Sequence, residues 1–179
     1  MSFYEKTLTR EDKFIGKIFT AHRDTVELDD GTTAFREIVD HHGGVGIVAI
    51  DEGGNVLLVR QYRYAYAKEL VEIPAGKLEP GEDPIEAAGR ELSEETGYSA
   101  GSLISLGIDY PTPGYVGEII HIYLATDLRA GEQHLDKGEF LSYERMPFDE
   151  AVEKCLRGEI NDSKTVIGIL RAKRVLANG

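Results

Sequence analysis

The stretch AGKLEPGEDPIEAAGRELSEETGY, residues 75–98, combines clear helix signals with an unusual density of carboxylates. Asp83 can cap a helix, Pro84 suits its first position, and Glu86 completes an Asp-x-x-Glu capping box. Gly97 supplies the left-handed residue that ends a helix. The sequence therefore predicts a helix from Pro84 to the residue before Gly97. Four glutamates lie within it: Glu86, Glu91, Glu94 and Glu95.

The apolar side chains of this helix predict which face is buried. Projection at ~100° per residue gives one apolar stripe, defined by Ile85, Ala88 and Leu92. Glu91 and Glu95 project to the edge of that stripe rather than opposite it. Since residues four apart on a helix have Cβ atoms ~5–6 Å apart, these two carboxylates are neighbours. Removing each such ion from water costs on the order of several kcal/mol, so the helix needs a source of positive charge.

Two sources of positive charge are available to these carboxylates. Arg90 lies one turn before Glu94 and can pair with it, but one arginine does not balance three glutamates. A divalent cation would balance these charges. Oxygen ligands without Cys or His favour Mg²⁺, or Mn²⁺, over Zn²⁺. Because protein-bound Mg²⁺ commonly combines one or two carboxylates with substrate phosphates, the pattern indicates phosphate chemistry. The alternative is an ordinary Glu-rich, solvated helix face.

The segments on both sides of this helix predict an α+β fold. Residues 13–41 alternate apolar and polar side chains, with a hairpin turn at residues 29–31. Further strands are expected at 43–50, 55–65, 70–76, 103–110, 118–128 and 139–146, and helices at 147–158 and from 163 to the end. This order indicates helices packed on a mixed sheet. Residues 1–42 are expected to form an N-terminal antiparallel strand layer or dimer element, and residues 43–179 the main domain.

Charge and cysteine content exclude several classes of function. The 179-residue chain has a formal net charge of −12, which argues against nonspecific binding to nucleic acid or anionic membranes. A small anionic substrate stays compatible if local cations neutralise it. Cys155 is the single cysteine, which fits a reducing compartment, and it lies at an apolar position of an amphipathic helix. With neither a secretory signal nor an apolar run that could span a bilayer, we expect a soluble cytoplasmic protein.

The segment from Gly76 to Tyr98 resembles the Nudix box. Gly76, five residues, Glu82, seven residues and then the run RELSEETGY match the fixed positions of that motif. The resemblance implies a Nudix-type α/β/α sandwich around a mixed sheet, with the box as loop, helix and loop. It also implies hydrolysis of a nucleoside diphosphate linked to another moiety.

This resemblance assigns roles to the residues of the box and the residue before it. Glu91 and Glu95 would be the main metal ligands, and Glu94 would be a ligand or an outer-shell partner. Arg90 would hold the glutamates in orientation, and the carbonyl of Ala75 would add a metal ligand. The glycines of the box would let the backbone turn tightly and approach the ion.

Sequence outside the box is similar to the ADP-ribose pyrophosphatase subfamily of Nudix hydrolases. The segments REIVDH, RQYR, ELVEIPAGK and INDSKT resemble that subfamily, and Pro113 lies sixteen residues after Gly97, where the subfamily carries a proline. A simple turn in PTPG is the alternative explanation of this proline. In such enzymes the N-terminal strands exchange across a two-fold dimer and both chains build each site. The resemblance thus implies a homodimer with swapped N-terminal strands.

The subfamily resemblance also implies substrate contacts, and Pro113 is one candidate. Arg36 and Glu37 would help hold the adenosine half, and Arg63 would contact the phosphates, with Arg60 as a second candidate. Glu72 would contact the terminal ribose. The alternatives are exposed strand ends for the two arginines of RQYR and a cross-strand surface charge for Glu72.

Hydrolysis requires a base for the attacking water, and metal coordination makes that water more acidic. In this subfamily a glutamate on a mobile loop after the last core strands has this role, and TDLRAGEQHLDKGEF occupies that place. Glu139 is the expected base, with Glu132 and Glu144 as substitutes, and a solvated loop glutamate is the alternative.

Together these patterns predict Mg²⁺-dependent hydrolysis of ADP-ribose or a related ADP-sugar to AMP and a sugar phosphate. One alternative is a Nudix hydrolase of another nucleoside diphosphate derivative, such as a nucleotide sugar or a dinucleoside polyphosphate. The other is a noncatalytic, nucleotide-sensing Nudix module.

Overall fold

The computed structural model describes residues 3–178, which divide into two compact units. The first unit contains residues 3–43 and the loop Tyr110–Ile119, and the second contains Gly44–Asp109 and residues 120–178. The loop is held to the first unit by backbone hydrogen bonds, from Val39 N–H to the carbonyl of Tyr115 at 2.8 Å and from Gly117 N–H to the carbonyl of Val39 at 2.9 Å. The expected division at residue 42 had placed this loop in the main domain.

The first unit is built on a three-stranded antiparallel sheet in the order β1-β2-β3. The strands are β1 (Lys6–Ile15), β2 (Phe19–Glu27) and β3 (Thr33–His41). The predicted hairpin turn joins β2 to β3, and Gly31 within it has φ +80°. Strand β1 begins seven residues earlier than the alternating pattern predicted.

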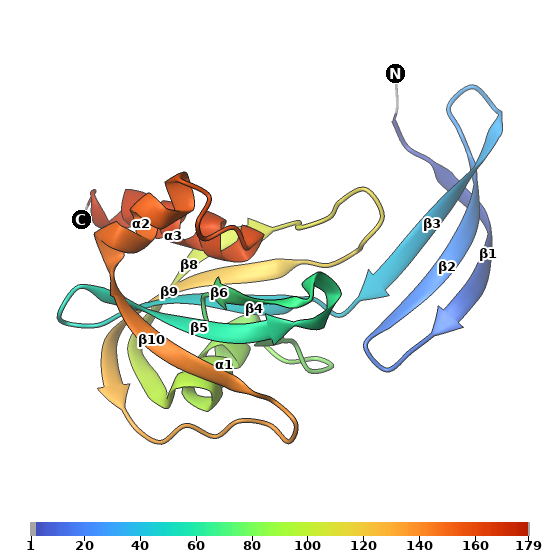
Figure 1. Ribbon diagram of the computed structural model, residues 1–179. Coiled ribbons are helices and arrows are strands. Elements are labelled where there is room, and N and C mark those ends of the chain that lie inside the picture. Colours follow the sequence, from blue (N-terminus) through green and yellow to red (C-terminus); the bar gives the residue numbers. More distant parts are fainter. Residues whose placement is uncertain (1–2, 179) are drawn as a thin grey trace. The chain divides into compact units, whose positions relative to one another are not determined.

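The second unit contains a seven-stranded mixed sheet (Figure 1). Strands β10, β5, β4, β9 and β8 follow one another, while β6 pairs with β5 and β7 pairs with β4. Only β4 and β9 run parallel among these pairs. The strands are β4 (Gly44–Ile50), β5 (Asn55–Arg63), β6 (Lys68–Glu72), β7 (Ala75–Lys77), β8 (Tyr98–Asp109), β9 (Ile120–Ala130) and β10 (Leu141–Pro147), and a short 3₁₀ helix, η1 (Tyr64–Tyr66), follows β5.

Helices cover both faces of this sheet. Side chains alternate between the two faces along each strand, so a buried strand needs packing partners on both sides. In β4, Ile47 packs with Ala88 and Leu92 of α1 (Pro84–Thr96), whereas Val48 packs toward the opposite helices. Those helices are α2 (Phe148–Leu156) and α3 (Ser163–Leu176), and Figure 1 shows them on the face opposite α1. The predicted α/β/α sandwich is confirmed.

Helix α1 begins and ends at the predicted residues. The Asp83 carboxylate accepts a hydrogen bond from Ile85 N–H at 3.0 Å, and Gly97 ends the helix at φ +75°. The predicted buried stripe is wrong at one position, because Ile85 is 42% exposed. The buried residues Ala88, Leu92 and Glu95 instead form the stripe, so a carboxylate occupies a position that helix periodicity usually gives to an apolar residue.

The helices at the C-terminal end contribute to the core as their apolar faces predicted. Cys155 is buried in the cluster beneath α2 and α3, and burial raises the pKa of its thiol to about 11. Within residues 3–178, no helix combines the length and apolarity needed to cross a membrane.

Candidate active site

Strand β7 and helix α1 bring three of the predicted metal ligands, Ala75, Glu91 and Glu95, together with Gly76. The carboxylate of Glu95 accepts a hydrogen bond from the N–H of Ala75 at 2.9 Å. The Glu91 carboxylate lies so close to Gly76 that an added Cβ would be 1.9 Å from its carboxyl carbon. Any larger residue at position 76 would force the Glu91 carboxylate to move from its present place.

Burial and mutual repulsion act on these carboxylates in the same direction. Burial, with a smaller contribution from the charges of Glu91 and Glu139, raises the pKa of Glu95 to about 8, against the hydrogen bond from Ala75 and the charge of Lys164. Burial also raises the pKa of Glu91, against the hydrogen bond and the charge of Arg90, and the charges of Glu94 and Glu139 add to the rise. The site therefore concentrates negative charge that a bound cation would relieve.

Arg90 donates hydrogen bonds to three glutamates of the box. Its Nη1 donates to Glu91 at 2.8 Å and to Glu94 at 2.9 Å, which confirms the predicted pair with Glu94. Its Nε and Nη2 donate to Glu82 at 2.9 and 3.0 Å. The contact with Glu82 was not predicted, since in the sequence Glu82 is only a matched motif position eight residues before Arg90.

The donor set of this cluster fits a hard divalent cation. Between residues 3 and 178, no three His, Cys, Asp or Glu side chains already converge as a metal site. Instead Arg90 engages Glu91 and Glu94, while Glu95 turns to the backbone of Ala75. All available donors are oxygens, two of the carboxylates carry raised pKa values, and the glycine backbone leaves space beside one of them, which suits Mg²⁺ or Mn²⁺.

The loop between β9 and β10 is tied to the end of α1. Gly131 N–H donates to the carbonyl of Gly97 at 2.7 Å, and His134 N–H donates to the carbonyl of Glu94 at 3.0 Å. Near its far end this loop carries Glu139, whose charge raises the pKa of both glutamates of the cluster. The carboxylate of Glu139 therefore lies within electrostatic range of the proposed metal ligands.

The two substitute bases lie in different surroundings. Glu132 is exposed, and Glu144 faces Arg60, whose Nη2 lies 3.4 Å from the Glu144 carboxylate. Neither charge is among the main causes that raise the pKa of Glu91 and Glu95. The surroundings thus favour Glu139 over its substitutes, and its role as base stays a prediction.

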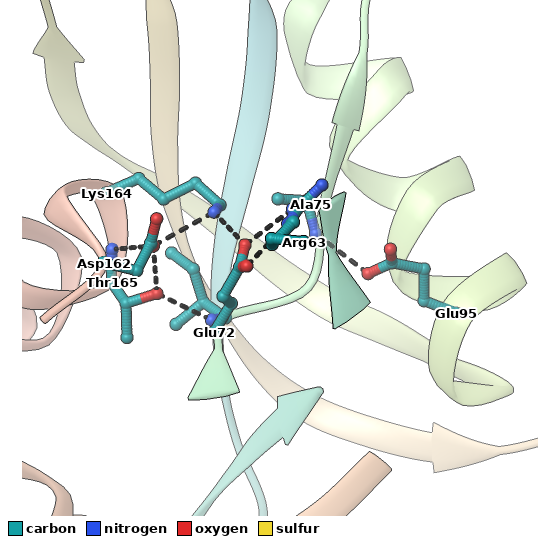
Figure 2. A network of polar contacts seen from close by, with 8 residues as sticks. Arg63, Glu72, Ala75, Glu95, Asp162, Lys164 and Thr165 are labelled. Atoms are coloured by element: carbon teal, nitrogen blue, oxygen red, sulfur yellow. Dashed lines mark hydrogen bonds and ion pairs between the residues drawn. The ribbon is translucent and has the colours of Figure 1, made fainter. Parts of the chain in front are cut away.

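Arg63 and Glu72 form a bidentate ion pair beside the cluster (Figure 2). Both donors, Nε and Nη2 of Arg63, lie 2.7 Å from the carboxylate oxygens of Glu72. Glu72 is 1% exposed, so the alternative of a surface charge at this position is wrong. The hydrogen bond to Glu72 is the main cause that raises the pKa of Arg63, and the charge of Glu95 adds to the rise, so the guanidinium lies within electrostatic range of the cluster.

Lys164 and two residues that support it, all at the start of α3, complete this network, and the sequence did not predict it. Lys164 donates to Glu72, and Thr165 Oγ1 accepts from the N–H of Ile73 at 2.9 Å. Asp162 caps α3 and accepts from Thr165 N–H at 3.0 Å. The only sequence signal was their place in the segment INDSKT.

The remaining predicted substrate contacts lie in the first unit. Arg36 donates from Nε to Glu5 at 2.8 Å, Glu37 is exposed and opposite Arg23 in register, and Pro113 is exposed. The relation of these residues to the glutamate cluster of the second unit stays a prediction.

Comparisons with known proteins identify the family. Residues 40–166 match the model of the NUDIX domain. The chain is 39% identical over 170 residues to "ADP-ribose pyrophosphatase" of Bacillus subtilis (strain 168), which covers 94% of this chain and 92% of that relative. It is 44% identical over 169 residues to "Methanol dehydrogenase activator" of Bacillus methanolicus, with 93% and 91% covered.

A solved structure supports the same assignment. A protein described as "Crystal structure of ADP compounds hydrolase" superposes with a TM-score of 0.87 and 25% identity, over 99% of this chain and 97% of that one. The family match includes the helix with its crowded glutamates, the glycine that admits Glu91 and the loop that carries Glu139. The chain therefore belongs to the Nudix family.

Proposed function

We propose that this chain is a Mg²⁺- or Mn²⁺-dependent hydrolase that cleaves the diphosphate of ADP-ribose or a related ADP-sugar to AMP and a sugar phosphate. The observation that carries the proposal is the buried Glu95 together with the largely buried Glu91, packed against the backbone of Ala75 and Gly76. The names of the relatives from Bacillus subtilis and among solved structures support the substrate class.

The metal would be held by the carbonyl of Ala75 and the carboxylates of Glu91 and Glu95, with Glu94 as a ligand or outer-shell partner. A bound divalent cation supplies charge neutralisation at phosphate oxygens and makes a bound water more acidic. Arg90 keeps Glu91 and Glu94 oriented through the hydrogen bonds from its Nη1.

The remaining residues act on water and substrate. Glu139 takes the proton of the attacking water, whose oxygen forms a bond to one phosphorus while the bridging P–O bond breaks. Arg63 neutralises the phosphates, with Arg60 as a second cation, and Glu72 contacts the terminal ribose. With ADP-ribose the products are AMP and ribose 5-phosphate.

A homodimer with exchanged N-terminal strands would complete each site, with Arg36 and Glu37 contacting the adenosine half and Pro113 contacting the substrate. Large apolar side chains on the strands of the first unit support an interface, because soluble monomers seldom expose such groups together. They include Phe14, Ile15, Phe19 and Phe35, all of them exposed. Light scattering that shows a monomer would rule out this dimer. We also propose a cytoplasmic location, in keeping with the single, buried cysteine.

A second candidate function is regulation of a partner enzyme, which the 44% identity to the activator from Bacillus methanolicus supports. The intact glutamate cluster indicates that such a role would operate through hydrolysis rather than through nucleotide sensing alone. Activation through hydrolysis and activation without it can be separated by assaying a purified dehydrogenase with wild-type protein and with Glu95→Gln. Activation by both proteins would indicate a noncatalytic effect.

The experiment that tests the proposal is a panel of diphosphate compounds incubated with Mg²⁺, including ADP-ribose, other nucleotide sugars and dinucleoside polyphosphates. AMP released fastest from ADP-ribose supports the assignment. Faster cleavage of another compound would assign a different substrate to the protein, and the proposed diphosphate hydrolysis would still hold.

A further inference from the structure

The Glu72 carboxylate has two cationic partners that approach from different elements (Figure 2). Arg63, at the end of β5, donates through Nε and Nη2 at 2.7 Å. Lys164, in the first turn of α3, donates from Nζ to Oε2 of the same carboxylate. These two contacts connect residues nine and ninety-two positions from Glu72.

The two cations differ in their access to solvent. The side chain of Arg63 is 40% exposed, whereas that of Lys164 is 10% exposed and that of Glu72 is 1% exposed. Arg63 thus lies at the open side of the pair, and its Nη1 has no partner among residues 3–178. Lys164 lies on the closed side, where a substrate anion has little access.

A second carboxylate fixes Lys164 in place. Asp162 Oδ2 accepts from Lys164 Nζ at 3.0 Å, from Thr165 N–H at 3.0 Å and from Thr165 Oγ1 at 2.6 Å. Because the Thr165 hydroxyl donates to Asp162, its lone pair can accept from the N–H of Ile73 at 2.9 Å. The ammonium of Lys164 is therefore held between Asp162, which caps α3, and Glu72, which ends β6.

We propose that Lys164 is a positioning residue: it is the permanent counterion of Glu72, and so allows Arg63 to turn to the substrate's phosphates without leaving a buried carboxylate unpaired. The proposal rests on the proposed function, which assigns Arg63 to the phosphates. The physical reason is that removing one partner of a buried ion pair leaves an uncompensated charge. Without Lys164, every displacement of the Arg63 guanidinium toward a phosphate would leave the buried Glu72 carboxylate without a cationic partner.

The test is a double-mutant cycle on ADP-ribose hydrolysis with saturating Mg²⁺. Lys164→Met should raise KM on the order of 30-fold, as expected for truncation of a buried charge pair, while kcat stays within about threefold. In the Glu72→Gln background, where no carboxylate needs the ammonium, the same substitution should change KM less than about threefold. An unchanged KM in Lys164→Met, or an equal rise in both backgrounds, would overturn the proposal.

Two control variants separate charge from structural support. Lys173→Met removes an exposed lysine of the same helix, paired with Asp149 at 2.6 Å, and should keep the wild-type KM. Thr165→Val removes the other link of the network and should lower Tm but not raise KM. A rise in KM with Thr165→Val that equals that of Lys164→Met would show general support of the segment and contradict the counterion role.

If Lys164→Met is too unstable for kinetic assays, its thermal stability can test the proposal instead. In that case the Glu72→Gln/Lys164→Met double variant should recover much of the lost Tm, and failure to recover it would contradict the proposal. Wild-type protein that leaves ADP-ribose intact would instead refute the proposed function, and the role of Lys164 with it.

Discussion

Glu95 in metal-free protein offers a quantitative test of the site, because burial raises the pKa of its carboxyl from 4.5 to about 8. Between these two pH values the folded protein keeps a proton on Glu95 that the unfolded chain has lost. The folded state then binds more protons, so the free energy of unfolding decreases as pH rises. This stability is fully present below pH 4.5 and is lost progressively up to about pH 8.

The size of the effect follows from the same shift. At about 1.4 kcal/mol for each pKa unit, the rise from 4.5 to about 8 corresponds to a ceiling on the order of 5 kcal/mol. Water entry and side-chain motion relieve part of the cost of a buried ion. We expect Glu95→Gln to be about 2 to 4 kcal/mol more stable than wild type at pH 8, relative to their difference at pH 4.5. The carboxamide oxygen that this substitution introduces can still accept the hydrogen bond from Ala75.

The assay is urea unfolding of both proteins in EDTA across this pH range. Because the comparison cancels titration elsewhere in the chain, the difference between the two curves reports Glu95. Added Mg²⁺ should restore stability to wild type at pH 8 and less so to Glu95→Gln, since binding to the folded state alone stabilises it. Parallel pH curves for the two proteins would refute the claim that a buried carboxylate with a raised pKa is held for a cation.

Three further substitutions test individual contacts. Glu139→Gln should lower kcat by about 10²–10⁴-fold with the affinity for Mg²⁺ unchanged, whereas Glu132→Gln should keep the wild-type kcat. Steady-state kinetics with Mg²⁺ titration measures both quantities. Equal losses of kcat in the two variants would contradict the assignment of Glu139 as the base. Gly76→Ala should displace the Glu91 carboxylate, because the new Cβ would lie 1.9 Å from its carboxyl carbon, and so weaken Mg²⁺ binding in calorimetry; an unchanged affinity would contradict that packing. Thr165→Val should lower the free energy of unfolding by about 1–3 kcal/mol, because a buried backbone N–H loses its acceptor, and urea unfolding with no change would contradict the importance of that hydrogen bond.

Local sequence signals predicted helix α1 well, because its cap, its end and the spacing of its carboxylates depend on neighbours within one or two turns. The degree of burial was harder to predict. Glu95 is 3% exposed because β7 folds back against α1, and a helix projection contains no information about that strand. The same limit explains Ile85, which the apolar pattern placed in the stripe but which is exposed.

Contacts between distant segments could not be predicted from spacing. The pair of Arg63 and Glu72 depends on the register of β5 and β6, which η1 and the residues around it set. Lys164 reaches Glu72 across ninety-two residues, and only the packing of α3 on the sheet brings them together. A lysine at the start of a helix has no sequence feature that distinguishes a buried counterion from a solvated side chain.

The most direct test of the proposed function is release of AMP and ribose 5-phosphate from ADP-ribose with Mg²⁺, measured for wild type and for Glu95→Gln. We expect equal amounts of the two products from wild type and loss of most of the rate in the variant, with both proteins folded. Wild-type protein that leaves ADP-ribose intact would contradict the substrate assignment. A Glu95→Gln variant as active as wild type would contradict the metal site itself.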